Sequence, residues 1–154
     1  MSPRYENDPT KVAASIEVFP KDDYEFIIGE PKAFERTNAK GLQSYGVRFP
    51  IQVAEGDYKG KRTVFSTYQQ SEGARQMEKR FIMAVLGYGN KREEEKRFDV
   101  DYAGMDWGID TDTAAVGDMY RELVGKRVIG SLDIRIGDDG SEQQNFTGWR
   151  SLNA

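Results

Sequence analysis

Apolar and polar residues alternate over three stretches in the first half of the chain, which is the pattern of half-buried β-strands. These stretches span residues 24–36, 42–54 and 62–68. Pro31 lies inside the first stretch and predicts a bend or an edge position, because proline cannot donate to a central ladder. Polar turns that contain glycine separate the stretches, so the pattern predicts three strands joined by short loops.

The alternation also predicts which side chains face the core. In the second strand the apolar face consists of Val47, Phe49, Ile51 and Val53. Arg48 and Gln52 alternate with this set and are expected to point the other way. Phe65 and Tyr68 are three positions apart on one strand, so we expect one of the two in the core. The other phenylalanines that we assign to the core from their apolar stripes are Phe26, Phe49 and Phe81.

The period changes at residues 71–86, where apolar residues recur every three or four positions, as on an amphipathic helix. Ser71 is expected to cap the start of this helix, and Gly87 to end it. Residues 88–118 lack a strong period and predict an insertion with at most one short turn of helix. A further short helix is expected at residues 118–124.

Two more strands are predicted near the end of the chain, at residues 126–136 and 143–150. The turn sequence at residues 137–140 joins them as a hairpin. Gly130 lies inside the first of these strands, where a barrel strand often needs a bend.

Three strands, a helix and a hairpin form the element order of the OB-fold, a five-stranded Greek-key barrel with its helix between strands three and four. The fold prediction is therefore mainly β with one or two helices. A different small β-barrel or an open α+β sheet remain alternatives. We expect residues 1–18 to form a flexible arm and residues 19–154 a single OB-like domain, with an acidic insertion at about 88–118.

Composition narrows the chemistry further. The 154 residues suit a single domain. The chain contains no cysteine and no histidine, which excludes thiolate nucleophiles, disulfides, Cys/His zinc sites and Ser-His-Asp triads. No enzyme activity and no cofactor is predicted. No apolar run could span a membrane, and the N-terminal residues lack a secretory pattern, so the cytoplasm is expected.

Charge is distributed unevenly, although the net charge is only -4. Residues 31–98 contain 14 basic and 8 acidic residues, whereas residues 99–118 contain 6 aspartates and no base. Residues 1–30 are acidic, and residues 119–154 are balanced. Because screening limits attraction to roughly 8–10 Å, a local basic cluster can bind phosphate despite an acidic average.

In the basic part of the chain, and again at its end, cations stand beside aromatic residues. Single-stranded nucleic acid is bound by this combination, since cations follow the backbone and rings stack on bases. Packing of the rings in a small barrel is the competing explanation, and Trp149 in particular fits either role, as an outward ring or a packed one. The candidate binding residues are Phe34, Arg36, Lys40, Tyr45, Arg48, Tyr58, Lys59, Lys61, Arg62, Tyr68, Trp149 and Arg150.

Four segments resemble phage-encoded single-stranded DNA-binding proteins: DDYEFIIGEPKAFERTNAKG, EGDYKGKRTVF, LVGKRVIGSLDIR and NFTGWRSL. The resemblance implies an OB-like domain that coats single-stranded DNA during phage replication, recombination or repair, in the host cytoplasm, with replication or recombination proteins as further partners. The matching positions are Tyr58, Lys59, Gly60, Lys61, Arg62, Gly125, Lys126, Arg127, Gly148 and Trp149.

The acidic segment 99–118 lies outside this resemblance. We hypothesise that it competes with DNA for the basic cleft or docks a partner. Asp99, Asp101 and Asp110 echo the spacing of a calcium loop, but Ala103 and the missing terminal Glu depart from it, so no metal site is assigned. The alternative function is a phage structural or protein-interaction module that binds no nucleic acid. Pairing of open barrel edges leaves a homo-oligomer as an option.

Overall fold

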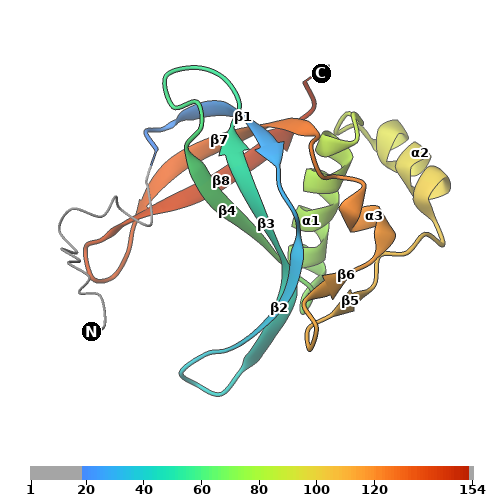
Figure 1. The fold of residues 1–154 in the computed structure, drawn as a ribbon, viewed down its shortest axis with the longest axis horizontal. Helices are drawn as coiled ribbons and strands as arrows, with labels where there is room; N and C mark the ends of the chain where they lie inside the picture. The colour runs from blue at the N-terminus through green and yellow to red at the C-terminus, as the bar shows by residue number, and fades with distance from the viewer. Residues whose placement is uncertain (1–18, 153–154) are drawn as a thin grey trace, which may run out of the picture.

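The computed structural model describes residues 19–152, which form a mainly β fold with a strongly curled antiparallel sheet, shaped like half a barrel (Figure 1). The predicted arm at residues 1–18 lies outside the described residues. The strands of the sheet are β1 (Asp22–Ile28), β2 (Lys32–Thr37), β3 (Gln43–Val53), β4 (Arg62–Tyr68), β7 (Arg127–Ile136) and β8 (Glu142–Arg150).

β1 and β2 act as one long bent strand. β1 pairs with the end of β3 on one side and with β7 on the other, while β2 pairs with the beginning of β3. The chain bends at residues 29–31, as Pro31 predicts. β4 pairs with the other edge of β3, and β8 pairs with β7. Each strand predicted from the sequence is therefore present, within about two residues of its expected ends, and the first is divided at its proline.

The concave side of the sheet holds an aromatic core. Phe26, Phe49 and Phe81 are fully buried, as the alternation predicted, and Phe65 rather than Tyr68 is the core member of β4. Helix α1 (Glu72–Val85) brings Phe81 against Phe65, with ring centroids 4.8 Å apart, and against Trp149 of β8 at 4.7 Å. α1 thus fills the interior between β4 and β8.

The ends of α1 follow the sequence prediction. The Ser71 side chain accepts a hydrogen bond from the backbone N–H of Ala74 (3.1 Å), which caps the first turn. Gly87 follows the helix with a φ of +90°, a conformation in which glycine avoids the steric cost of a side chain.

The insertion contains more structure than the sequence predicted. Residues 92–102 form helix α2 (Arg92–Tyr102), followed by a small hairpin of β5 (Ile109–Asp110) and β6 (Ala115–Val116), and by α3 (Asp118–Arg121). The described chain therefore has three helices rather than one or two. Figure 1 shows α2, α3 and this hairpin together on the α1 side of the sheet. None of the helices in residues 19–152 is long and apolar enough to cross a membrane.

Candidate nucleic-acid interface

The outer surface of β2, β3 and β4 gathers five of the predicted binding residues. Residues directly opposite one another on neighbouring strands lie on the same face of the sheet. Lys32 of β2 is opposite Arg48 of β3. Gly46 of β3 lies between Phe34 of β2 and Tyr68 of β4. Because Arg48 alternates along β3 with the buried Val47 and Phe49, its face is the outer surface of the sheet. We call this surface the basic face, and it consists of Lys32, Phe34, Arg36, Arg48, Arg62 and Tyr68.

The cations of the basic face are exposed, and none has an ionic partner among the residues that the structure describes. Within residues 19–152, no carboxylate lies within ion-pair distance of Lys32, Arg36, Arg48 or Arg62. The strand residues of this face include no acidic side chain. Four positive charges are therefore available to an incoming polyanion. Lys32 was not predicted from the sequence. It is two residues before Phe34 and four before Arg36 on β2, so strand alternation places it on the same face.

Two aromatic rings lie among these cations. The Phe34 and Tyr68 rings meet edge to face with centroids 5.6 Å apart, and the Arg48 guanidinium lies 4.7 Å above the Phe34 ring. Phe34 is buried beneath these neighbours, whereas Tyr68 keeps 37% of its surface exposed. Tyr68 is consequently the ring on this face that can offer a surface to a base.

Gly46 allows the strands to approach at this point. A Cβ atom on Gly46 would lie 1.8 Å from the backbone oxygen of Thr67, a distance that no side chain tolerates. The absence of a side chain also leaves room for the rings of Phe34 and Tyr68 to meet across β3.

The predicted loop residues lie beyond the two ends of the basic face. Lys40 is exposed in the turn between β2 and β3, while Lys59 and Lys61 are exposed in the loop between β3 and β4. Tyr58 belongs to the second loop, but its ring packs against Phe19 and Tyr24 at 5.7 and 5.9 Å. Lys59 and Lys61 therefore extend the cationic surface, and Tyr58 holds their loop against the core.

Tyr45 and Trp149 are not on the basic face. Tyr45 lies opposite Glu35 and alternates with Arg48, so it is on the other surface of β3. Trp149 points inward and packs on Phe65 with a centroid distance of 4.7 Å, so of the two roles that the sequence left open the structure shows the packed one, and its assignment as a binding residue is corrected. The cause is a bulge: Leu132 faces Phe146 and Ser131 faces Gly148, which leaves Thr147 as an extra residue and reverses the alternation after it.

Gly130 accommodates this inward ring. A Cβ atom on Gly130 would lie 2.7 Å from the Trp149 ring and 3.0 Å from Phe26, so a side chain there would displace the tryptophan. The structure thus gives Gly130 a packing role directly opposite Trp149.

The remaining predicted residue, Arg150, lies on the outer surface of the other half of the sheet, where the arginines are paired. Arg150 is 3.2 Å from Asp23, and Arg127 lies 3.0 Å from Glu25 and 3.2 Å from Glu55. We call this region, Asp23, Glu25, Glu55, Arg127 and Arg150, the ion-paired face. Its carboxylates outnumber its arginines, so its local charge does not attract phosphate.

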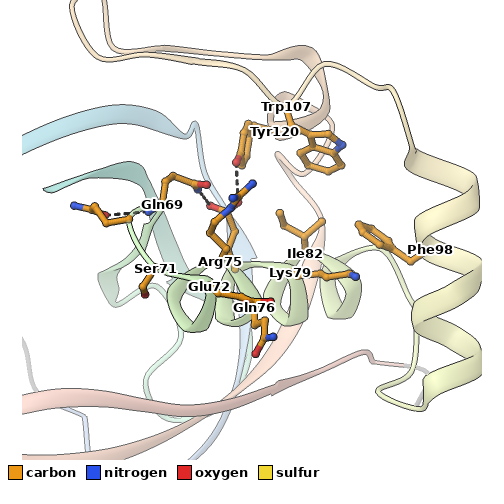
Figure 2. Close-up of a pocket in the computed structure, with 12 residues that line it drawn as sticks. Gln69, Ser71, Glu72, Arg75, Gln76, Lys79, Ile82, Phe98, Trp107 and Tyr120 are labelled. Atoms are coloured by element: carbon orange, nitrogen blue, oxygen red, sulfur yellow. Dashed lines mark hydrogen bonds between the residues drawn. The ribbon is translucent and has the colours of Figure 1, made fainter.

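A separate pocket of about 660 Å³ lies between the start of α1 and the insertion, and Figure 2 shows Gln69, Arg75 and Tyr120 converging on it, with Trp107 and Phe98 at one side. The buried Glu78 carboxylate accepts hydrogen bonds from Gln69 Nε2 (2.7 Å) and from the Tyr120 hydroxyl (2.8 Å). Burial is the largest cause that raises the pKa of the Tyr120 phenol, and the negative charge of Glu78 is the second. This network ties the residue after Tyr68 to α1 and α3.

Three aspartates of the insertion have hydrogen-bond or ion-pair partners, one of which lies on α1. Asp99 pairs with Lys79 at 2.8 Å, Asp101 accepts a hydrogen bond from the Tyr88 hydroxyl, and Asp106 accepts one from the Gly108 N–H at 3.1 Å. Asp99 and Asp101 belong to α2 and not to a loop, so the calcium-loop spacing has no structural counterpart. Competition of segment 99–118 with DNA stays a prediction.

A scan against models of protein families gives no match to this chain, and a search of curated proteins gives no matching relative. The function therefore has to be argued from the residues and their geometry.

Proposed function

We propose that this protein binds single-stranded DNA, without strong sequence preference, across the basic face. The observation that carries the proposal is that the basic face combines the exposed Tyr68 ring with four cations, none of which is ion-paired within residues 19–152. Phosphates would contact Lys32, Arg36, Arg48 and Arg62, while a base would stack on Tyr68. Such stacking contributes about 1–3 kcal/mol per base and accepts every base.

The chain topology supports an OB-like barrel as the scaffold. The joined β1–β2 strand pairs with both β3 and β7, α1 stands between β4 and β7, and β7–β8 forms the closing hairpin. In OB-folds the second and third strands and the adjoining loops hold oligonucleotides. In the proposed OB-like scaffold those strands are β3 and β4, which contribute Arg48, Arg62 and Tyr68 to the basic face.

The length of the basic face suits a short stretch of DNA. Arg62 and Tyr68 stand six residues apart on β4, or about 20 Å at the usual strand rise. The loops with Lys40 and Lys59 extend the surface at either end. OB-fold domains occupy about 4–16 nucleotides. We place this activity in phage DNA replication, recombination or repair because of the sequence resemblance, with replication or recombination proteins as partners.

A gel-shift comparison tests the proposal. The protein should retard a labelled oligo-dT at low salt, retard a duplex of equal length less, and lose affinity for oligo-dT as salt rises. Four phosphate contacts on a single strand correspond to a slope of about -3 in log K against log salt. Failure to bind oligo-dT at low salt would overturn the proposal and favour a protein-interaction module.

A further inference from the structure

A small pocket opens on the outer surface of the sheet where β1 ends and the chain bends toward β2. Its volume is about 270 Å³, and the residues that matter for its chemistry are Ile27, Gly29, Pro50, Gln52 and Arg62. It adjoins the basic face through Arg62, which belongs to both.

The register explains why this pocket is on the outside. Ile27 lies opposite Gln52, and Gln52 lies opposite Arg62, so the three side chains form one row across β1, β3 and β4. The same alternation that buries Phe26 and Ile51 turns this row outward.

Gly29 keeps the pocket open. Its N–H donates to the backbone oxygen of Pro50 at 2.7 Å, which brings the bent chain close to β3. A Cβ atom at this position would lie 3.0 Å from both the Cγ and the backbone oxygen of Pro50. A larger residue would therefore crowd the pocket beside its apolar wall.

The polar side chains of the pocket have no hydrogen-bond or ionic partner within the described chain. Among residues 19–152, the Gln52 carboxamide and the Arg62 guanidinium make no side-chain hydrogen bond or ion pair, although Gln52 is half-buried. A half-buried carboxamide offers one acceptor and two donors to a ligand. The wall formed by Ile27 and Pro50 is apolar.

A nucleobase has matching chemistry, with flat apolar faces, polar edges and an attached phosphate. We propose that one base of the bound single strand enters this pocket, lies against Ile27 and Pro50, and pairs through its edge with Gln52. Arg62 contacts the adjoining phosphate. This inference rests on the proposed function and adds a base-reading position to it.

The size of the pocket favours a single base. Sites for drug-sized ligands span roughly 300–1,000 Å³, and this pocket is slightly smaller. Because a carboxamide both donates and accepts, Gln52 can pair with O4 and N3–H of thymine and with complementary groups on other bases. The pocket therefore raises affinity for bases in general and imposes little sequence preference.

Binding of an oligo-dT and of an abasic oligonucleotide of equal length, each over a series of salt concentrations, tests this inference. Gln52→Leu removes the carboxamide at similar volume, and Gln52→Trp fills the pocket. Gln43→Leu on the same strand but the other face is the matched control. Circular dichroism reports folding, and Gln52→Leu alone carries the test if Gln52→Trp does not fold.

We expect Gln52→Leu to weaken oligo-dT binding about fivefold, the effect of one or two lost hydrogen bonds, and to leave abasic binding and the salt slope unchanged. Gln43→Leu should match the unmodified protein. If both oligonucleotides bind the Gln52 variants as they bind the unmodified protein, the pocket holds no base, while the proposed function stands. If the unmodified protein does not bind oligo-dT at low salt, both proposals fail.

Discussion

Arginines stand on both halves of the outer sheet surface, but their neighbours differ. On the basic face, Arg36, Arg48 and Arg62 have no carboxylate within ion-pair distance in residues 19–152. On the ion-paired face, Arg127 lies between two glutamates and Arg150 beside Asp23. A phosphate that approaches Arg127 meets a local charge of -1, whereas the basic face presents +4.

This difference shows why counts of charged residues mislead about binding. An exposed ion pair contributes only about 0–1 kcal/mol to stability, so its arginine is not locked in place. Its carboxylate nevertheless repels a second anion at close range. The position of the acids, rather than the number of bases, therefore decides which half of the sheet attracts DNA.

The largest expected effect comes from removing the unpaired arginines together. The triple variant Arg36→Ala, Arg48→Ala, Arg62→Ala should weaken oligo-dT binding about a hundredfold, because three charged hydrogen-bond donors are lost. Its salt slope should become shallower by about 2. Fluorescence titration over a salt series measures both values.

The matched control is the double variant Arg127→Ala, Arg150→Ala, which removes arginines from the ion-paired face. It should change affinity less than about threefold. An equal loss in the two variants would mean that both halves contact DNA, and the comparison would be wrong.

Removing the exposed ring of the basic face should have the next largest effect. Tyr68→Ala should weaken oligo-dT binding about tenfold through lost stacking, while Tyr68→Phe keeps the ring and the affinity. Tyr45→Ala, on the other surface of β3, should leave affinity near that of the unmodified protein. The same titration checks the three variants, and a loss in Tyr45→Ala equal to that in Tyr68→Ala would contradict the assignment.

A buried network adjoins the basic face in the chain, because Gln69 follows Tyr68 and donates a hydrogen bond to Glu78. Tyr120→Phe removes a hydrogen bond to buried Glu78 and should lower the free energy of unfolding by about 1–2 kcal/mol in urea denaturation. Oligo-dT affinity should stay within about twofold at a temperature where the variant is folded.

The contribution of Tyr120 to the free energy of unfolding should also depend on pH in the alkaline range. The folded state raises the pKa of Tyr120 above its ordinary value of 10.0, so its contribution to stability is complete below that value and is lost as the pH rises beyond it. The unmodified protein should therefore lose stability more steeply than Tyr120→Phe as the pH rises above about 10. Parallel curves would show that Tyr120 does not carry this dependence.

The smallest expected effect comes from removing carboxylates from the ion-paired face, which makes its charge more like that of the basic face. Glu25→Gln with Glu55→Gln removes both carboxylates beside Arg127 and should raise oligo-dT affinity about two- to threefold, with a salt slope steeper by about 0.7. Glu35→Gln, on β2 but on the surface away from the basic face, is the matched control. An unchanged affinity in Glu25→Gln, Glu55→Gln would show that paired acids are not what excludes DNA from that half.

Much of the fold follows from sequence periodicity. Alternation in β3 and β4 separates Phe49 and Phe65 from Arg48 and Tyr68, because strand side chains alternate strictly where no bulge intervenes. Trp149 shows the limit: the bulge at Thr147 depends on pairing between β7 and β8, which no local pattern reveals.

Helix α2 was missed for a different reason. Its sequence, REEEKRFDVDY, buries only Phe98, so it has almost no apolar stripe. The available signal was its row of glutamates in the first turn, which favours a helix N-terminus through the helix dipole. The cations and rings of the candidate site could be predicted from the sequence. Only the strand register shows which of them share a surface and which lie beside a carboxylate.

Mapping the oligo-dT contact surface by NMR tests the central claim most directly. Backbone amide shifts recorded with and without a short oligo-dT should change in β2, β3 and β4 and in the loops that contain Lys40 and Lys59. Amides beside Asp23 and Arg150, which lie away from the Ile27 pocket, should stay unperturbed. Shifts confined to the ion-paired face, or to the pocket around Gln69, Trp107 and Tyr120, would contradict the account.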